Sequence, residues 1–231
     1  MKARVLTPEL LDSLPPDDPA AQASRRDLRR LHPWLGQISL WTRWFAENFP
    51  VRPPASLADL GAGDGSLLGT VLLRAYPKGG HGARIFFVDR QPVVPEAALA
   101  HFRRCNWLPT IMATDVFQWA EESPPMEAVL ANLFLHHLED EGVTRLFSSL
   151  AGRTTCFAAA EPRRSRPAWW AARSLGWIGC HPVTRHDARV SVEAGFAGQE
   201  LSRLWPARTG WHLAEHEAGP FTHFFTARRT G

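Results

Sequence analysis

Short runs of apolar residues alternate with helix-length segments from residue 56 onward, and this alternation constrains the fold of the 231-residue chain more than any other feature. Successive runs lie roughly 20–30 residues apart, a spacing typical of strands that are connected through helices. Strands connected in this way form a parallel sheet with helices on both faces. We therefore expect an α/β fold whose strands span 56–61, 84–89, 110–115, 127–134 and 155–161.

The C-terminal part of the chain has a different pattern. Two apolar runs, 211–219 and 221–229, are joined by Gly219-Pro220, which predicts an antiparallel strand pair at one edge of the sheet. The preceding stretch, 162–191, is expected to form an amphipathic helix followed by a loop.

The N-terminal part is expected to form a helical cap over residues 1–50, ahead of the sheet domain at 51–231. Residues 1–22 are rich in Pro and Asp and predict a loose lead-in. Apolar residues recur at helical spacing over 23–49, and Pro33 is positioned to divide this segment into two helices.

Composition excludes several classes of protein. The chain is 45% hydrophobic and 21% charged, as globular chains are, and its net charge of +3 does not argue for a nucleic-acid partner. It has no long uncharged apolar stretch and no apolar run behind its basic start, so we expect neither a membrane span nor a secretory signal. Its three cysteines lack metal-site spacing, which favours free thiols in the cytoplasm: Cys105, Cys156 and Cys180.

A glycine-rich loop follows the first expected strand and precedes a helical run. Its form is D-x-G-x-G-x-G, with Asp59, Gly61, Gly63 and Gly65 at the fixed positions. The glycines permit tight turns and close approach of a ligand to the backbone. A dinucleotide loop would carry a third glycine where Ser66 stands, and a carboxylate at Asp59 suits a cation such as the amino group of S-adenosylmethionine better than a pyrophosphate.

Polar side chains end the next three expected strands, at the sheet edge where open α/β folds bind ligands. Asp89, followed by Arg90, is suited to accept from ribose hydroxyls, and Asp115 to accept from an adenine amine beside Val116. Asn132 closes the fourth strand. Any one of these acids also fits a loop residue or a helix cap.

The motifs DLGAGDGS, FFVD, ATDVF and ANLFLHHL, spread over about residues 57–161, resemble those of class I S-adenosylmethionine-dependent methyltransferases. The segments 132–140, 161–166 and 183–196 resemble more narrowly a bacterial subgroup linked to polyketide synthases and akin to ubiquinone/menaquinone-type enzymes. The resemblance implies a Rossmann-like fold with S-adenosylmethionine as cofactor. It also implies that the loop and strand-end residues named above bind that cofactor.

Three histidines are candidates for a general base, because a phenolic acceptor benefits from a group that titrates near neutrality. His136 and His137 follow the fourth strand, and His186 lies in the loop expected after residue 180. A packed helix start and a polar surface loop are the structural alternatives. No metal-binding motif is present, so we expect no metal.

The segment 162–191 is the candidate substrate lid. Trp169, Trp170 and Trp177 would supply an apolar surface, and the helix at 23–49 would close the opposite side with Trp34, Trp41 and Trp44. A buried core helix and a membrane-surface contact are the alternatives for this tryptophan-rich segment.

The sequence thus predicts a cytoplasmic methyltransferase that acts on a small hydrophobic acceptor, aromatic, quinol or polyketide-like, with oxygen preferred over carbon as the methylated atom. One alternative is a related protein that binds the cofactor without turnover. Another is a nucleotide-dependent oxidoreductase. An RNA methyltransferase would require a basic patch on the folded surface.

Overall fold

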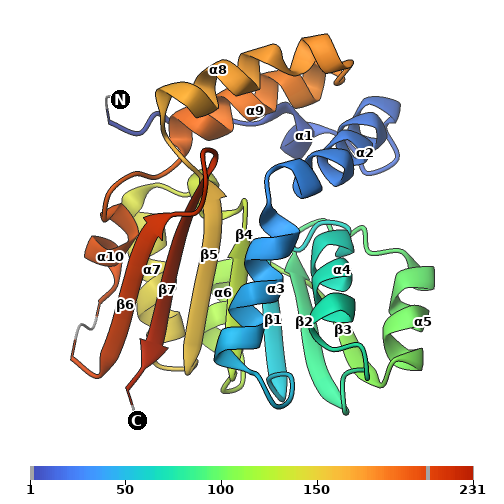
Figure 1. The fold of residues 1–231 in the computed structure, drawn as a ribbon, viewed down its shortest axis with the longest axis vertical. Helices are drawn as coiled ribbons and strands as arrows, with labels where there is room; N and C mark the ends of the chain where they lie inside the picture. The colour runs from blue at the N-terminus through green and yellow to red at the C-terminus, as the bar shows by residue number, and fades with distance from the viewer. Residues whose placement is uncertain (1–2, 207–208, 231) are drawn as a thin grey trace.

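A seven-stranded sheet forms the centre of the computed structural model, which describes residues 3–206 and 209–230 (Figure 1). The strand order is β3-β2-β1-β4-β5-β7-β6. The strands span β1 Ser56–Leu60, β2 Ala83–Asp89, β3 Trp107–Ala113, β4 Ala128–Asn132, β5 Cys156–Pro162, β6 Trp211–Glu217 and β7 Thr222–Arg229. The first five strands pair in parallel, and β7 runs antiparallel between β5 and β6. The α/β class and the antiparallel pair expected from the sequence are confirmed.

The boundaries of β3 and β4 differ most from the sequence prediction, and other strand ends shift by one or two residues. β3 begins at Trp107 rather than at residue 110 and ends at Ala113. Pro109 lies inside this strand, which is possible because β3 is an edge strand whose outer side needs no ladder bond. β4 ends at Asn132, because Leu133 adopts a φ of 52° and leaves the extended conformation.

Helices cover both faces of the sheet. One face packs against α3 (Gln37–Asn48), α4 (Ser66–Ala75) and α5 (Glu96–Arg104). The other packs against α6 (Val116–Glu122), α7 (Asp140–Ala151) and α10 (Glu200–Leu204). Alternate residues of β1 enter the two cores, with Leu57 on the first side and Ala58 on the second, as the two-residue period of a strand requires.

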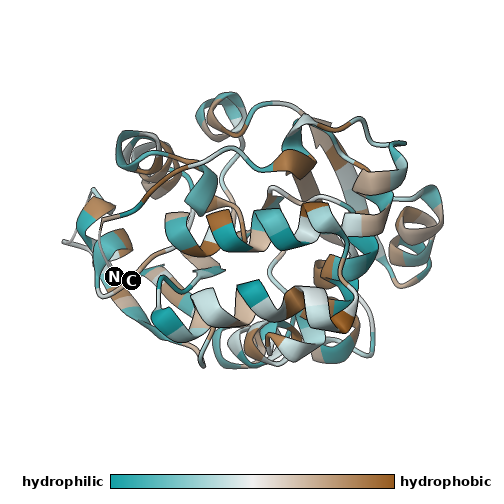
Figure 2. Cartoon of the chain, turned by 90° about the horizontal axis from the view of Figure 1, so that it is seen from above, coloured by the Kyte–Doolittle hydropathy of each residue, from teal (hydrophilic) through white to brown (hydrophobic). Residues whose placement is uncertain are grey.

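A separate layer lies over the carboxyl ends of the parallel strands (Figure 1). It consists of α1 (Leu10–Ser13), α2 (Pro19–Trp34), α8 (Arg166–Ser174), the short 3₁₀ turn η2 (Leu175–Ile178) and α9 (Pro182–Ala194). Seen from above, hydrophilic and hydrophobic residues alternate along the helices of this layer (Figure 2). Asp18 caps α2 by accepting from the backbone N–H of Ala20. The predicted division at Pro33 is wrong, because Pro33 lies inside the last turn of α2 and the break between α2 and α3 falls at Gly36, whose φ is 71°.

The prediction of a loop at the end of segment 162–191 is wrong, because residues 182–194 form the helix α9. Pro182 occupies the first turn, where its missing N–H costs nothing, and His181 caps the helix by accepting from the N–H of Val183 at 3.3 Å. Polar residues of the inner face, including Thr184 and Asp187, are buried and hide the helical period in the sequence. Within the described residues, no helix is long and apolar enough to cross a membrane.

Candidate functional site

The glycine loop turns sharply between β1 and α4. Gly61, Gly63 and Gly65 have φ values of 68°, 54° and 66°, in the left-handed region that favours glycine. A Cβ on Gly61 would lie 2.4 Å from Cδ2 of Phe134, whereas one on Gly63 would meet nothing within 4 Å. The loop is therefore pressed against the end of β4 at Gly61 and open at Gly63.

Asp89, the last residue of β2, holds this loop. Its Oδ2 accepts from the N–H of Gly63 at 2.9 Å, and its Oδ1 accepts from the N–H of Gln91 at 2.8 Å. Each carboxylate oxygen keeps a free lone pair for a further donor. Asp89 thus stands at the end of its strand, as expected, and contacts the glycine loop there.

Asp59 is a buried acid beside the loop. Asp59 is only 8% exposed. Burial and the nearby charge of Asp89 raise its pKa to about 7, and within the described residues no hydrogen bond or cation lowers it. A carboxylate in such a place gains much from a cationic partner.

A cavity of about 160 Å³ adjoins Asp59 and the loop. Its floor includes Asn132 and Leu133 at the end of β4, and Asn132 is held by a 2.9 Å hydrogen bond from Nε1 of Trp41. The cover comes from the N-terminal layer: Leu11, Arg25, Leu28, Arg29 and His32.

An ion pair joins this cover to the loop. Nη1 of Arg29 lies 2.6 Å from Oδ2 of Asp64, which also accepts from the N–H of Ser66 at the start of α4. The N-terminal layer therefore closes directly onto the glycine loop.

Asp115 lies two residues beyond β3 and caps α6, accepting from the N–H of Phe117 at 2.8 Å. Arg90 donates to its Oδ2 at 2.9 Å through Nε. Burial opposes the effect of these bonds, yet they hold the pKa of Asp115 below its usual value. The predicted residues Arg90, Asp115 and Val116 are thus brought together, with Val116 buried behind the cap.

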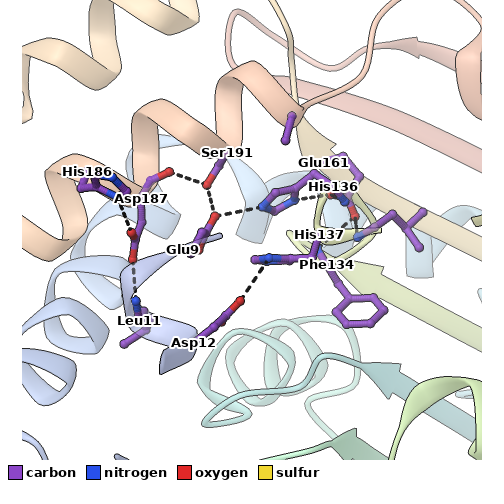
Figure 3. A network of polar contacts seen from close by, with 12 residues as sticks. Glu9, Leu11, Asp12, Phe134, His136, His137, Glu161, His186, Asp187 and Ser191 are labelled. Atoms are coloured by element: carbon purple, nitrogen blue, oxygen red, sulfur yellow. Dashed lines mark hydrogen bonds and ion pairs between the residues drawn. The ribbon is translucent and has the colours of Figure 1, made fainter. Parts of the chain in front are cut away.

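His136 is enclosed between two carboxylates (Figure 3). Its Nδ1 donates to Oε2 of Glu161 at 2.8 Å, and its Nε2 donates to Oε1 of Glu9 at 3.2 Å. Burial alone would lower the pKa of His136, but the hydrogen bonds and charges of Glu161 and Glu9 raise it to about 9. His136 therefore keeps its proton at neutral pH.

Glu161, at the end of β5, organises the turn that carries these histidines. Its carboxylate is fully buried and accepts from the backbone N–H groups of Phe134, Leu135 and His136 at 3.1, 2.8 and 3.3 Å. Sequence reasoning did not assign a role to Glu161, although an acid at the end of a buried strand was a visible signal.

His137 has a different environment. Its Nδ1 lies 3.3 Å from Oδ2 of Asp12 in α1. Burial and the neighbouring charge of His136 lower the pKa of His137, against the attraction of nearby acids. It is therefore neutral at neutral pH and able to accept a proton. It belongs to the 3₁₀ turn η1 (Leu135–His137), which begins two residues after Leu133 of the cavity wall.

Glu9, His136 and His137 also place one potential metal ligand atom each within 4.8 Å of the others. Two of these side chains already satisfy each other as an ion pair. Ser191 of α9 adds a hydrogen bond to Glu9 (Figure 3).

His186 lies on α9 and not with the other two histidines. It lines a groove between α8 and α9, and its Nδ1 is 3.0 Å from Oδ1 of Asp187. Asp187 in turn accepts from the N–H groups of Leu10 and Leu11 at 2.8 and 3.0 Å, which ties α1 to α9.

The candidate tryptophans do not line the cavity beside Asp59. Trp169 is half-buried and donates to Glu193 at 3.0 Å. Trp170 and Trp177 are 63% and 93% exposed on the helical hairpin that α8, η2 and α9 form. Of the three N-terminal tryptophans expected to close the pocket, Trp34 is 85% exposed, whereas Trp41 and Trp44 of α3 are buried in the core beside the sheet. Trp41 lies next to Asp59 and Asn132, with which it lines a small pocket.

Solved structures share this fold. The plantazolicin methyltransferase BpumL in complex with SAH (S-adenosylhomocysteine) is 13% identical to this chain; the match covers 93% of this chain and 92% of that one, with a TM-score of 0.66. An O-methyltransferase family protein from Burkholderia thailandensis is 16% identical over 92% of this chain and 60% of its own, with a TM-score of 0.60.

The magnesium protoporphyrin IX methyltransferase from Synechocystis, also with bound SAH, is 13% identical; it matches over 84% of this chain and 82% of its own, with a TM-score of 0.53. No protein-family profile and no curated protein sequence matches the chain. At these identities the likeness establishes the Rossmann-like fold of these enzymes.

Proposed function

We propose that the chain is an S-adenosylmethionine-dependent methyltransferase. The observation that carries the proposal is the buried carboxylate of Asp59, which lines a cavity beside the glycine loop and has no cationic partner among residues 3–206 and 209–230. The ammonium group of an amino-acid cofactor supplies that cation. The fold shared with methyltransferases that bind SAH supports the same assignment.

The other loop and strand-end residues fit the remaining parts of this cofactor. Asp89 has free lone pairs for the ribose hydroxyls, and Gly63 leaves space for close approach. Asp115 and Val116, just beyond the end of β3, would flank the adenine, and the side chain of Arg90 would move away from Asp115. When bound, the cofactor supplies an electrophilic methyl group, and the protein supplies position and a dry site.

The acceptor is proposed to be a small hydrophobic molecule, with a phenol, quinol or polyketide hydroxyl methylated in preference to carbon. Of the three candidate histidines, His137 is the proposed base. It is neutral at neutral pH, whereas His136 already carries its proton and His186 lies away in the α8–α9 groove. Asp12 would orient His137 and stabilise its protonated form.

The N-terminal layer is proposed to open for ligands. The cavity of about 160 Å³ is covered by α2 and Leu11, and its Arg29–Asp64 ion pair is exposed enough to break at little cost. Closure after binding would exclude water from the reacting groups.

The proposal is tested by incubating the protein with S-adenosylmethionine and a panel of phenols, quinols and aromatic polyketides, and measuring the release of S-adenosylhomocysteine. We expect the parent to release S-adenosylhomocysteine only when an acceptor is present, and we expect the Asp59→Asn variant to lose this release. Cofactor binding with no release for any acceptor would favour a binding protein without turnover, for which the closed cover over the cavity is the supporting observation. Reduction of NAD instead would favour an oxidoreductase.

A further inference from the structure

The helices α8 and α9 lie side by side in the layer above the sheet (Figure 1). A basic groove of about 330 Å³ lies between them. Its walls carry three guanidinium groups and an imidazole, and are formed by Ala172, Arg173, Pro182, Arg185, His186 and Arg189. No carboxylate is among the lining residues.

The three arginines have no carboxylate partner among residues 3–206 and 209–230. Arg173 lies over the ring of Trp169 at 4.7 Å. The guanidinium of Arg185 packs against Gly176, where an added Cβ would lie 3.0 Å from its Cζ. Nε of Arg189 donates to the carbonyl of Arg185 at 3.3 Å.

Two acids close to the groove are bonded to other groups. Asp187 accepts from the backbone of α1 and contacts His186, and Asp27 of α2 accepts from the N–H of His181 and the hydroxyl of Thr184. Within the described residues, neither forms an ion pair with an arginine of the groove. Other arginines of the chain do form ion pairs with acids, as Arg145 does with Glu121 and Arg164 does with Glu200. Concentrated positive charge of this kind attracts an anion.

The same hairpin exposes large apolar side chains. Trp177 and Ile178 in the connecting turn are 93% and 69% exposed, and Trp170 on α8 is 63% exposed. Arg173 joins the two features, because its guanidinium carbon lies 5.9 Å from the ring centre of Trp170. The apolar tip and the basic groove thus belong to one continuous surface.

We propose that this hairpin docks on a lipid bilayer with anionic headgroups. The phosphates would bind the guanidinium groups of the groove, while Trp177 and Ile178 enter the headgroup region, where tryptophan is favoured. The bilayer is preferred over an acidic protein because the apolar residues form a narrow turn between two helices, which a deformable surface accommodates without a matching pocket. This inference stands independently of the proposed methyl transfer.

The test is co-sedimentation of the full chain with phosphatidylcholine vesicles, with and without phosphatidylglycerol. Binding should be at least roughly tenfold stronger to the anionic vesicles and should fall with added salt. Arg185→Gln combined with Arg189→Gln should reduce binding to anionic vesicles by roughly tenfold or more. The matched control, Arg43→Gln combined with Arg74→Gln, removes two exposed charges outside the hairpin and should bind as the parent does.

The apolar part of the surface is tested with Trp177→Ser combined with Ile178→Ser. This variant should bind anionic vesicles severalfold more weakly, whereas Trp34→Ser, which removes an equally exposed tryptophan from α2, should not. All variants change exposed side chains, so unchanged melting temperatures should accompany these effects.

Three outcomes would overturn the proposal. The first is equal binding, or none, with the two vesicle types. The second is equal effects of the hairpin variants and their controls. The third is capture of a polyglutamate peptide with undiminished affinity in the presence of anionic vesicles, which would assign the surface to an acidic polypeptide.

Discussion

Oε2 of Glu161 lies 2.8 Å from Nδ1 of His136, so the end of β5 is joined to the turn after β4 by a buried ion pair. The opposite nitrogen of the same ring reaches Glu9, which is also bonded to Ser191 on α9. One imidazolium therefore links the sheet to the N-terminal segment that covers the candidate site.

The imidazolium makes stability depend on pH. Because the folded-state pKa of His136 is raised from 6.5 to about 9, its stabilisation is complete below about pH 6.5 and is lost as pH rises through 9. The shift corresponds to roughly 3 kcal/mol. His136→Gln should therefore be most destabilising near pH 6 and should approach the parent above about pH 9, in denaturant unfolding at several pH values.

The exposed His212 supplies the control for this experiment. His212→Gln should follow the parent at every pH. A destabilisation by His136→Gln that is constant with pH would indicate that the ring contributes packing and not charge.

Asp59→Asn should stabilise the ligand-free protein. The pKa of Asp59 is raised from 3.8 to about 7, so its ionisation works against folding as pH rises between those values. The cost above pH 7 is roughly 4 kcal/mol, of which the amide should recover a part. Thermal melting near pH 8 should show a higher melting temperature for the variant, with the advantage absent near pH 4. A lower melting temperature at pH 8 would mean that Asp59 has a stabilising partner.

Gly61→Ala should cost more than Gly36→Ala, although both glycines have a φ near 70°. Both substitutions place a side chain in the left-handed region, at roughly 1–2 kcal/mol. Only at Gly61 would the new Cβ also clash, 2.4 Å from Cδ2 of Phe134, whereas a Cβ at Gly36 would meet nothing within 4 Å. We expect the free energy of unfolding to fall further in Gly61→Ala, together with weaker binding of S-adenosylhomocysteine. Equal losses in the two variants would contradict this reading of the loop.

His137→Asn tests the proposed base. The variant should lose roughly 10²–10⁴-fold in methyl-transfer rate to a phenol near neutral pH. Activity should partly recover as the pH approaches the pKa of the phenol, since the acceptor then ionises without help. The control variant His186→Asn should keep the parent rate, because His186 lies in the α8–α9 groove and does not line the cavity. A loss in His137→Asn that pH does not rescue would indicate positioning only.

The sheet was predictable from sequence because each strand is a continuous apolar run between turn signals. The glycine loop was predictable for a related reason, since its conformations are accessible to few residues other than glycine. The helix α9 was missed because its buried face carries Thr184 and Asp187, whose partners come from the distant N-terminal segment.

The histidine network was only half visible in the sequence. His136 and His137 were identified from their place after β4, but Glu9 and Asp12 stand more than 120 residues earlier, in a stretch that composition describes as a loose lead-in. Their role depends on α1 folding over the strand ends, which no local pattern encodes. The exposure of Trp34, Trp170 and Trp177 could not be predicted either, because the sequence of an amphipathic helix does not show which face meets solvent.

The central claim is that Asp59 and the glycine loop bind S-adenosylmethionine, and isothermal titration with S-adenosylhomocysteine tests it most directly. The parent should bind, with NAD giving no heat under the same conditions. Asp59→Asn should bind roughly tenfold to a hundredfold more weakly, the value of a charge-assisted hydrogen bond to the ammonium group. Binding of NAD without binding of S-adenosylhomocysteine, or equal affinity of the Asp59→Asn variant, would contradict the account.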